Sequence, residues 1–459
     1  MKRLIGNKQF YRMVLLITVP IMIQNGITNF VNMLDNLMIG RVGTEQMSGV
    51  SIVNQLFFVF NITIFGAISG PGIFGAQFYG NKNHEGVRQT FRFKIILGVI
   101  ITGIGLILFS FFGEQLISLY LHDTKNPAKV LATLSYGKDY LRVMMLGIIP
   151  FVASQCYSST LRETGQTTIP MLAGIAAVAV NFCLNLVLIF GLLGFPKLGV
   201  VGAAIATVVS RVVECVFIVV WTHCNSERNQ FIQKVYRSLH ISKDLVVQML
   251  MKGTPLLINE ALWAGGMAML TQRYSTRGLD VVAGLNISTT ILNVFNIVFI
   301  ALGSSIAIIV GQLLGANKLK EAKETAGKLI FCSVVCCFLI GMIMALCSPL
   351  FPEAFDTYDS VKHLARNFIL ISAFLMPLNA FTHACYFTLR SGGKTIITFL
   401  FDSVFVWSIC IPTAYVLTEF TTLPILPIYL ICQSLEIVKC TIGFILVKKG
   451  VWINNIISS

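Results

Sequence analysis

Two carboxylic acids lie inside long apolar segments in the second half of the chain. Glu260 follows Lys252 by eight residues, and Asp402 follows Lys394 by the same number. On an α-helix each acid would lie about 12 Å beyond its lysine, at one depth from the same face of a membrane. Two such acids can share a proton or hold a sodium ion, so they predict a cation-coupling site. The alternative is that each one separately bonds a polar helix contact.

A second candidate cation site combines one acid with two amides. Asp35 interrupts an apolar segment, and Asn181 and Asn185 share one face of a later helix because they are four residues apart. An ionisable group at the centre of a bilayer costs from about 2.5 kcal/mol upward and by default marks a transport pathway. We therefore expect the amide oxygens to complete a cation or proton site with Asp35. Hydrogen bonding between helices is the structural alternative.

Two further pairs of charges lie in apolar segments. Arg211 and Glu214 are three residues apart, as are Glu436 and Lys439. At this spacing each pair can neutralise itself on its own helix. Because the pairs occur at corresponding ends of the two halves of the chain, we expect structural intramembrane ion pairs.

Membrane-spanning helices must position these side chains. Hydrophobic residues make up 55% of the 459 residues and charged residues only 12%, and a spanning helix needs about 20 predominantly apolar residues. The composition predicts an all-α polytopic membrane protein with twelve transmembrane helices. The spans are expected near residues 13–36, 46–72, 92–113, 138–160, 168–190, 199–222, 246–271, 281–309, 326–348, 366–388, 396–417 and 424–446.

The second half of the chain repeats the first at an offset of 235 residues. Pro20 matches Pro255 and Gln77 matches Gln312 without a gap between them. Repeats of this size in an apolar chain are typical of transporters. Each proline removes a backbone hydrogen bond from its span, so both are candidate hinges. The predicted parts are two pseudo-symmetric six-helix lobes, residues 1–222 and 246–459, joined by a polar linker, residues 223–245.

The net charge of +14 reflects topology rather than nucleic-acid binding. If the spans alternate, the side that holds the termini carries twenty-two Lys and Arg residues and the other side eight. This bias predicts that both termini and the linker are cytoplasmic. We expect a multi-pass protein of the plasma membrane that works as a monomer, with lipid and small molecules as its partners and no nucleic acid.

The sequence offers no catalytic or metal-binding motif. Neither H-E-x-x-H nor G-x-S-x-G occurs, and the twelve cysteines lie almost entirely in apolar segments without a C-x-x-C pair. We therefore expect no enzyme, no bound metal and no cofactor, apart from a transported proton or sodium ion.

Several characteristic strings follow one another along the chain. In the first half they are Val31-Asn-Met-Leu-Asp35-Asn-Leu-Met-Ile-Gly40-Arg-Val-Gly43, Gly75-Ala-Gln77-Phe-Tyr-Gly80, Leu161-Arg-Glu-Thr-Gly165-Gln, and Asn181-x-x-x-Asn185 before Ile189-Phe-Gly191. In the second half they are Leu389-Arg-Ser-Gly-Gly393-Lys, and then Pro255-Leu-Leu-Ile-Asn259-Glu260-Ala-Leu-Trp263 with Asp402-x-x-x-x-Trp407. Together these strings resemble the multidrug and toxic compound extrusion (MATE) family, and the likeness covers nearly the whole chain. The strings around Glu260 and Asp402 look most like the DinF-like bacterial branch.

The resemblance implies two six-helix lobes around a central cleft. It also implies a cation-driven antiporter that exports amphipathic, often cationic organic compounds by alternating access. By motif position, Asp35 and Asn181 match the family's first-lobe site and Glu260 matches a second-lobe acid. Many relatives carry an aspartate where Asn185 stands, a departure that bears on sodium binding in the first lobe.

Three other functions fit the sequence less well. A lipid-linked oligosaccharide flippase of the same wider superfamily would need a more cationic cleft, whereas the unpaired intramembrane charges of this sequence are acidic. A major facilitator carries a G-x-x-x-D-R-x-G-R-R string between spans two and three, and residues 80–86 do not supply it. A membrane scaffold has no reason to keep Glu260 and Asp402 at one depth.

Overall fold

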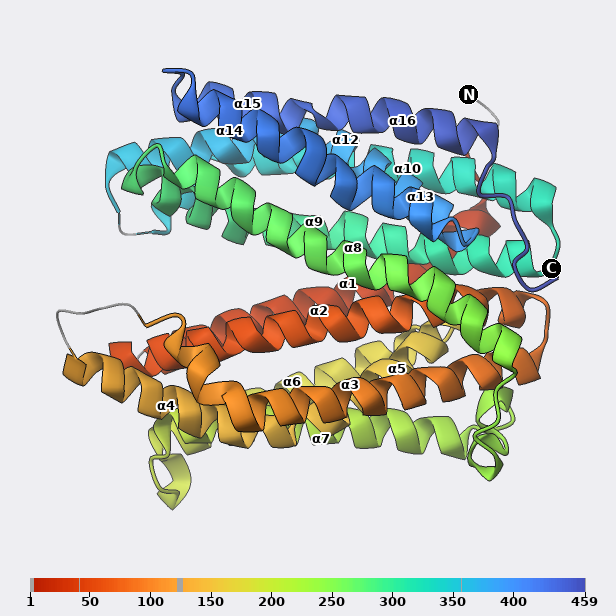
Figure 1. Cartoon of the computed structure of the whole chain (residues 1–459), viewed down its shortest axis with the longest axis horizontal. Coiled ribbons are helices and arrows are strands. Elements are labelled where there is room, and N and C mark those ends of the chain that lie inside the picture. Colours follow the sequence, from red (N-terminus) through yellow and green to blue (C-terminus); the bar gives the residue numbers. More distant parts are fainter. Residues whose placement is uncertain (1–3, 41, 122–126, 356, 459) are drawn as a thin grey trace. The chain divides into compact units, whose positions relative to one another are not determined.

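The computed structural model describes residues 4–40, 42–121, 127–355 and 357–458, without the side chains of residues 31–34, 36, 37, 40 and 193. Long helices joined by short turns make up this part of the chain, and it contains no strand (Figure 1). Four of the basic residues counted in the charge bias lie outside the described residues, namely Lys2, Arg3, Arg41 and Lys125.

The helices of the first repeat are α1 (Lys8–Gly40), α2 (Thr44–Gly80), α3 (His84–Ser118), α4 (Pro127–Leu146), α5 (Ile148–Glu163), α6 (Thr168–Phe190) and α7 (Gly199–Cys224). Short turns η1 (Leu192–Gly194), η2 (Gln230–Ile232) and η3 (Val235–Arg237) follow α6 and α7. The helices of the second repeat are α8 (Lys243–Ser275), α9 (Leu279–Gly315), α10 (Leu319–Cys347), α11 (Leu350–Glu353), α12 (Asp359–Ser391), α13 (Thr395–Phe399), α14 (Ile411–Glu419), α15 (Ile425–Ser434) and α16 (Glu436–Lys449). Two π-helical turns, η4 (Leu400–Val404) and η5 (Val406–Cys410), join α13 to α14.

Helix lengths reproduce the repeat found in the sequence. Helices α1 and α8 have 33 residues each, and α2 and α9 have 37 each. Pro20 and Pro255 occupy the same position within α1 and α8, well inside each helix. A proline there leaves one carbonyl without its helical hydrogen-bond partner. Both helices can therefore bend more easily at this matching position.

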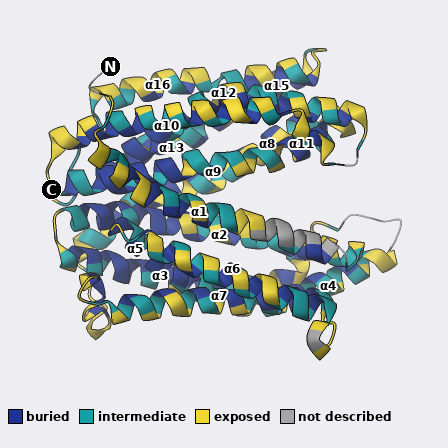
Figure 2. Cartoon of the chain, turned by 180° about the vertical axis from the view of Figure 1, so that it is seen from behind, coloured by how far each residue is buried: buried dark blue, intermediate teal, exposed yellow. Residues whose placement is uncertain are grey.

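The helices carry apolar side chains on faces that no other part of the described chain covers. On α10, Phe331, Val335 and Phe338 are exposed, whereas Ser333 and Cys337 on the opposite face are buried. Exposed apolar side chains also run along the lengths of α7 and α16 (Figure 2). In a water-soluble protein such continuous apolar faces would be unusual. They are the surface that a helix presents to lipid.

Ten helical segments of the described residues are long and apolar enough to cross a membrane. The pair α4 and α5, bent by 47° at Gly147, supplies another span. Helix α8 is equally long but more polar than these, because it holds Lys252, Glu260 and Arg273. With α8, the described helices account for the twelve spans expected from the sequence, although the fourth is broken rather than straight.

The chain folds as two compact units whose limits cut through helices. One unit contains residues 1–22, 76–83 and 250–459, and the other contains residues 23–75 and 84–249. Helices α1 and α2 therefore each contribute to both units. The lobe limits expected from the sequence, at 222 and 246, stay predictions.

Candidate functional site

In the unit formed by residues 23–75 and 84–249, Asp35 is the first of four linked polar groups. Asn185 Nδ2 lies 2.5 Å from Asp35 Oδ1 and 3.0 Å from Asn181 Oδ1. Asn181 Nδ2 in turn lies 3.4 Å from Thr207 Oγ1 on α7. The structure thus brings together all three residues that the sequence grouped. It adds Thr207, which the sequence analysis did not single out.

The sequence of α6 explains why these amides face inward. Its buried positions include Ala173, Ala177, Asn181 and Asn185, which recur every four residues and form one stripe along the helix. The two alanines let a neighbouring helix approach closely. Buried amides on the same stripe must then find polar partners, because an unsatisfied polar group is costly in this environment.

The orientation of Asn185 differs from the one expected. Its amide nitrogen, rather than its oxygen, faces Asp35. The side chain is fully buried, and its Oδ1 has no hydrogen-bond partner among the described residues. The amide that bonds the Asp35 carboxylate therefore carries an acceptor without a described partner, which is a group that a cation could use.

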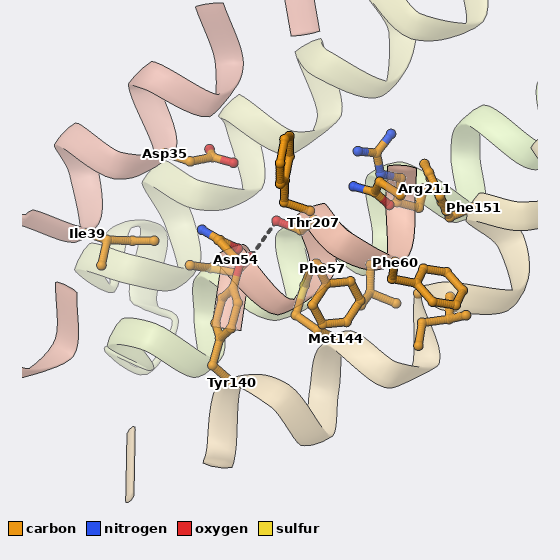
Figure 3. A pocket seen from close by; sticks show the side chains of 16 residues that line it. Asp35, Ile39, Asn54, Phe57, Phe60, Tyr140, Met144, Phe151, Thr207 and Arg211 are labelled. Carbon is orange, nitrogen blue, oxygen red and sulfur yellow. Dashed lines mark hydrogen bonds between the residues drawn. The ribbon is translucent and has the colours of Figure 1, made fainter. Parts of the chain in front are cut away.

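A cavity of about 300 Å³ opens beside this cluster, within the same unit. Asp35 and Arg211 lie on opposite sides of it, with aromatic side chains between them (Figure 3). Arg211 Nη1 lies 3.1 Å from Glu214 Oε2, and the guanidinium stacks 5.1 Å from the Phe151 ring. The cavity is lined by Asp35, Ile39, Asn54, Phe57, Phe58, Phe60, Asn61, Tyr140, Met144, Gly147, Ile148, Phe151, Ala203, Thr207, Val208 and Arg211.

The shape of the cavity follows from two features of the helices around it. Aromatic residues of α2 face the bend between α4 and α5 at Gly147, whose backbone lies close to Val208 of α7. Tyr140 on α4 bonds Asn54 on α2 at 3.3 Å. The result is an apolar, aromatic pocket with a few polar groups, which is the usual composition of a small-molecule site.

In the unit that contains residues 250–459, Asp402 lies at the centre of the second polar cluster. Lys439 Nζ on α16 lies 2.7 Å from Asp402 Oδ1, and Asn259 Nδ2 on α8 lies 3.1 Å from Asp402 Oδ2. Asn259 also bonds Ser403 and lies 3.4 Å from the Tyr386 hydroxyl. Asp402 sits in the π-turn η4, a local widening of a helix that often accompanies functional sites.

Lys439 keeps the pair that the sequence suggested and adds a closer one. Its ammonium lies 3.8 Å from Glu436 on its own helix but only 2.7 Å from Asp402. The expected Glu436–Lys439 pair is therefore part of a three-charge cluster. The spacing along α16 could not reveal the third charge, because Asp402 reaches Lys439 from another span.

Glu260 is half-buried and makes no direct ion pair among the described residues. The charged groups that act on it are Arg390 and Asp402. Its neighbour Asn259 bonds Asp402, so Glu260 and Asp402 lie in one region of the unit. Of the two acids, Glu260 is the one whose carboxylate is not already engaged by an ammonium.

A third buried cluster was missed by the sequence analysis. Lys94, which was counted among the cytoplasmic loop charges, is completely buried in α3. Its ammonium lies 2.6 Å from both carboxylate oxygens of Glu163 and 3.1 Å from the hydroxyls of Ser159 and Thr160. The only sequence signal was Glu163 itself, within the Leu161-Arg-Glu string.

Metal ligands are not gathered anywhere in the part of the chain that the structure describes. No three side chains of His, Cys, Asp or Glu come together there in a way that could hold a metal ion.

Comparison with known proteins places this architecture in a family. The MatE family model matches residues 20–187 and, a second time, residues 255–416. The two matches start at Pro20 and Pro255, which are the paired prolines of the internal repeat. The two matches cover most of the chain, and each of them lies within one copy of the internal repeat.

Similar proteins share this arrangement over nearly their whole length. A probable multidrug resistance protein, YoeA of Bacillus subtilis, is 25% identical over 424 residues, covering 91% of this chain and 89% of that protein. A probable multidrug resistance protein, NorM of Thermotoga maritima, is also 25% identical, covering 95% and 92%. Among solved structures, the outward-facing conformation of a multidrug resistance MATE family transporter of the MOP superfamily superposes with a TM-score of 0.85 at 19% identity, covering 98% and 97%. The chain therefore belongs to the MATE family of membrane transporters, and it has their all-α fold of twelve transmembrane helices in two lobes.

Proposed function

We propose that this protein is a cation-coupled antiporter that exports amphipathic organic compounds, many of them cationic, by alternating access. The observation that carries the proposal is the cavity beside Asp35. It combines the Asp35 carboxylate, which Asn185 bonds and for which the described residues form no ion pair, with walls of Phe57, Phe60, Phe151 and Tyr140. A flat, positively charged organic molecule would find both an anion and apolar aromatic surface there.

The same carboxylate can serve the coupling ion. When Asp35 is charged, it attracts an organic cation into the cavity; when it holds a proton or a sodium ion, that attraction is lost. Asn185 supports this exchange, because its amide bonds the carboxylate through Nδ2 while its Oδ1 has no partner among the described residues. Substrate and coupling ion would then compete for one group, which is sufficient for antiport if the two favour opposite-facing states.

Pro20 lies fifteen residues before Asp35 on the same helix, α1. We infer that loading Asp35 changes its bond to Asn185 and lets α1 bend near this proline. The matching Pro255 in α8 would act in the same way on the second site. This coupling of a charge to a hinge is the link between ion binding and the change of access.

Glu260 and Asp402 are proposed as a second coupling site. Lys439 and Asn259 hold Asp402 in place, whereas Glu260 has a carboxylate that no lysine or arginine of the described chain pairs directly. We assign the exchange of the cation to Glu260. Asp402 then contributes negative charge nearby and fixes the position of Asn259, the residue next to Glu260.

The surroundings of the protein follow from the charge bias and the lipid-facing helices. We propose that it lies in the plasma membrane, with both termini in the cytoplasm, and that it works as a monomer. The flippase alternative is less well supported, because the one cation among the residues that line the described cavity, Arg211, is already paired with Glu214.

Efflux of a fluorescent organic cation from vesicles tests the proposal. A proton gradient and a sodium gradient are imposed separately, and we expect one of them to drive export. Asp35→Asn should abolish gradient-driven export in a folded protein, whereas Asp139→Asn, which removes an exposed acid from the same unit, should not. Export without any ion gradient, or full export by the Asp35→Asn variant, would contradict the proposal.

A further inference from the structure

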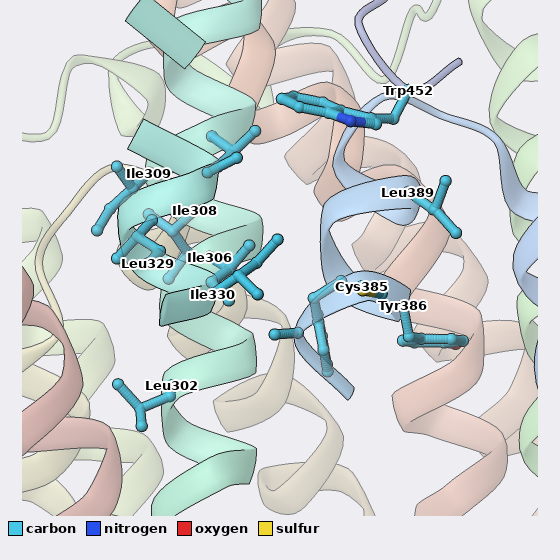
Figure 4. Close-up of a cluster of buried hydrophobic side chains, with 14 of the residues drawn as sticks. Leu302, Ile306, Ile308, Ile309, Leu329, Ile330, Cys385, Tyr386, Leu389 and Trp452 are labelled. Carbon is cyan, nitrogen blue, oxygen red and sulfur yellow. The ribbon is translucent and has the colours of Figure 1, made fainter. Parts of the chain in front are cut away.

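The last nine residues of the described chain fold back onto the protein instead of leaving it. After α16, Gly450 takes a left-handed conformation with φ of 70°, which ends the helix. Trp452 and Ile456 are then buried, with 1% and 5% of their surfaces exposed. Trp452 belongs to the same cluster of buried side chains as Leu389 and Tyr386 (Figure 4). We call residues 450–458 the C-terminal strap.

The strap binds a single buried amide of α2. Gln77 is completely buried, and its Nε2 donates to the carbonyl oxygens of Ser391 at 2.9 Å and Asn454 at 3.3 Å. Its Oε1 accepts from the backbone N–H of Ile456 at 2.9 Å. Both the nitrogen and the oxygen of the Gln77 amide therefore bond the strap. The nitrogen also bonds the end of α12.

Beneath the strap, α2 and α9 cross at very short range. A methyl group added to Gly80 would overlap the backbone carbonyl of Gln312, and one added to Gly315 would overlap that of Gln77. The repeat relates these two contacts to each other. The strap also reaches this crossing directly, because Asn455 Nδ2 donates to the carbonyl oxygen of Gly315 at 3.4 Å.

The crossing lies next to the point where α2 passes from one compact unit to the other. Helix α2 is continuous, yet its residues 44–75 belong to one unit and residues 76–80 to the other. Pro71, Gly72 and Gly75 lie just before the change, where the helix resists bending least. If the units rearrange during transport, the end of α2 either stays fastened to the unit that holds the strap or separates from it.

We propose that the C-terminal strap is a releasable latch. It holds the end of α2 against α9 through Gln77, and transport requires its release. This inference rests on the alternating-access function proposed above and goes beyond it, because the strap lies outside both copies of the repeat. Hydrogen bonds suit such a latch, since a few of them shift an equilibrium by a limited factor and can be exchanged for water.

The alternative is that the strap only stabilises the fold, so the test has to separate closure from stability. Gly311 and Ala76 face each other in the crossing, with 3.1 Å between Ala76 Cβ and a Cβ placed on Gly311. A small adjustment brings a cysteine pair at these positions into the range that a disulfide needs. The rate of disulfide formation in an Ala76→Cys/Gly311→Cys protein therefore reports how often the crossing is closed. Each single cysteine variant controls for the native thiols.

Two changes remove the latch in this background. Gln77→Met keeps the size of the side chain without its hydrogen bonds, and a stop codon after Lys449 removes the strap. We expect either change to lower the rate of disulfide formation by about tenfold, the effect of losing two or three hydrogen bonds. Ser458→Ala, at an exposed strap residue bonded only within the strap, and Asn81→Ala, at an exposed residue one turn beyond Gln77, should leave it unchanged.

Three results would overturn the latch. One is an unchanged rate of disulfide formation in both latch variants. Another is a lower melting temperature as their only effect. The third is a truncated protein that does not fold, because a strap that detaches in every cycle cannot be needed to hold the fold.

The same disulfide separates this inference from the proposed function. Oxidation should stop efflux in the double-cysteine protein, and reduction should restore it, if α2 and α9 separate during transport. Oxidation could stop efflux while Gln77→Met and truncation leave the rate of disulfide formation unchanged. That result would reject the latch and leave alternating access standing. An oxidised protein that still transports would reject the latch alone, because the crossing would then stay closed throughout transport. Loss of gradient-driven export in the reduced protein would instead contradict the proposed function.

Discussion

Replacement of Asp402 by asparagine tests whether this acid serves transport or only holds Lys439. The ammonium of Lys439 lies 2.7 Å from Asp402 and 3.8 Å from Glu436, and its side chain is 9% exposed. Removing one partner of a buried ion pair costs about 3–5 kcal/mol, because the other charge is left unpaired. Glu436 remains close enough to compensate in part. We therefore expect the lower end of that range, about 3 kcal/mol.

Adding Lys439→Met removes the stranded charge. The double variant Asp402→Asn/Lys439→Met should recover at least half of the loss, because replacing a buried pair by uncharged groups of similar size is often close to neutral. Equilibrium unfolding in mixed micelles gives these free energies. Glu321→Gln is the control, since it breaks an ion pair that is exposed on both sides and should change the free energy of unfolding by less than about 1 kcal/mol.

Efflux measured on the same variants then assigns the role of Asp402. If Asp402 contributes charge to the coupling site, the double variant regains stability but does not export. If export returns together with stability, Asp402 serves only to hold Lys439. The electrostatic reasoning itself is refuted if Asp402→Asn costs less than about 1 kcal/mol, or if the double variant is no more stable than the single one.

Three further predictions concern the unit around the first site and the linker. Lys94→Met and Glu163→Gln should each cost about 3 kcal/mol or more, with a double variant that costs less than their sum in a double-mutant cycle of unfolding free energies. Gly75→Ala should lower the melting temperature because its methyl would overlap the Glu163 carboxylate, whereas Gly103→Ala, which meets nothing within 4 Å, should not. A cysteine in place of the exposed Ser238 should react with an impermeant maleimide only after cells are permeabilised, and labelling in intact cells would contradict a cytoplasmic linker.

Features that repeat along the chain were predictable from the sequence. The apolar segments and the pairing of Pro20 with Pro255 predicted the transmembrane helices and their division into two repeats, because composition and local spacing act within one helix. The grouping of Asp35 with Asn181 and Asn185 also appeared in the structure. It could be anticipated because few polar groups occur in these spans, and buried polar groups must find each other.

Contacts that depend on the rotation and shape of helices could not be predicted. The π-turn at Asp402 widens its helix and the bend at Gly147 changes helix direction, both without a distinctive local motif. Lys94 looked like a loop charge because it lies at the edge of an apolar segment, yet α3 extends beyond that segment and buries it. Likewise, the partner of Lys439 depends on packing between spans, which spacing along one helix does not contain.

The division of α1 and α2 between the units has a consequence for the two halves of the chain as separate polypeptides. Residues 1–22 and 76–83 belong to the unit built mainly from residues 250–459. A polypeptide that ended at residue 222 would carry two segments whose packing partners are on the other half. Halves produced from separate genes would therefore have to exchange arms, as subunits do in a domain-swapped dimer, and neither would be an autonomous folding unit.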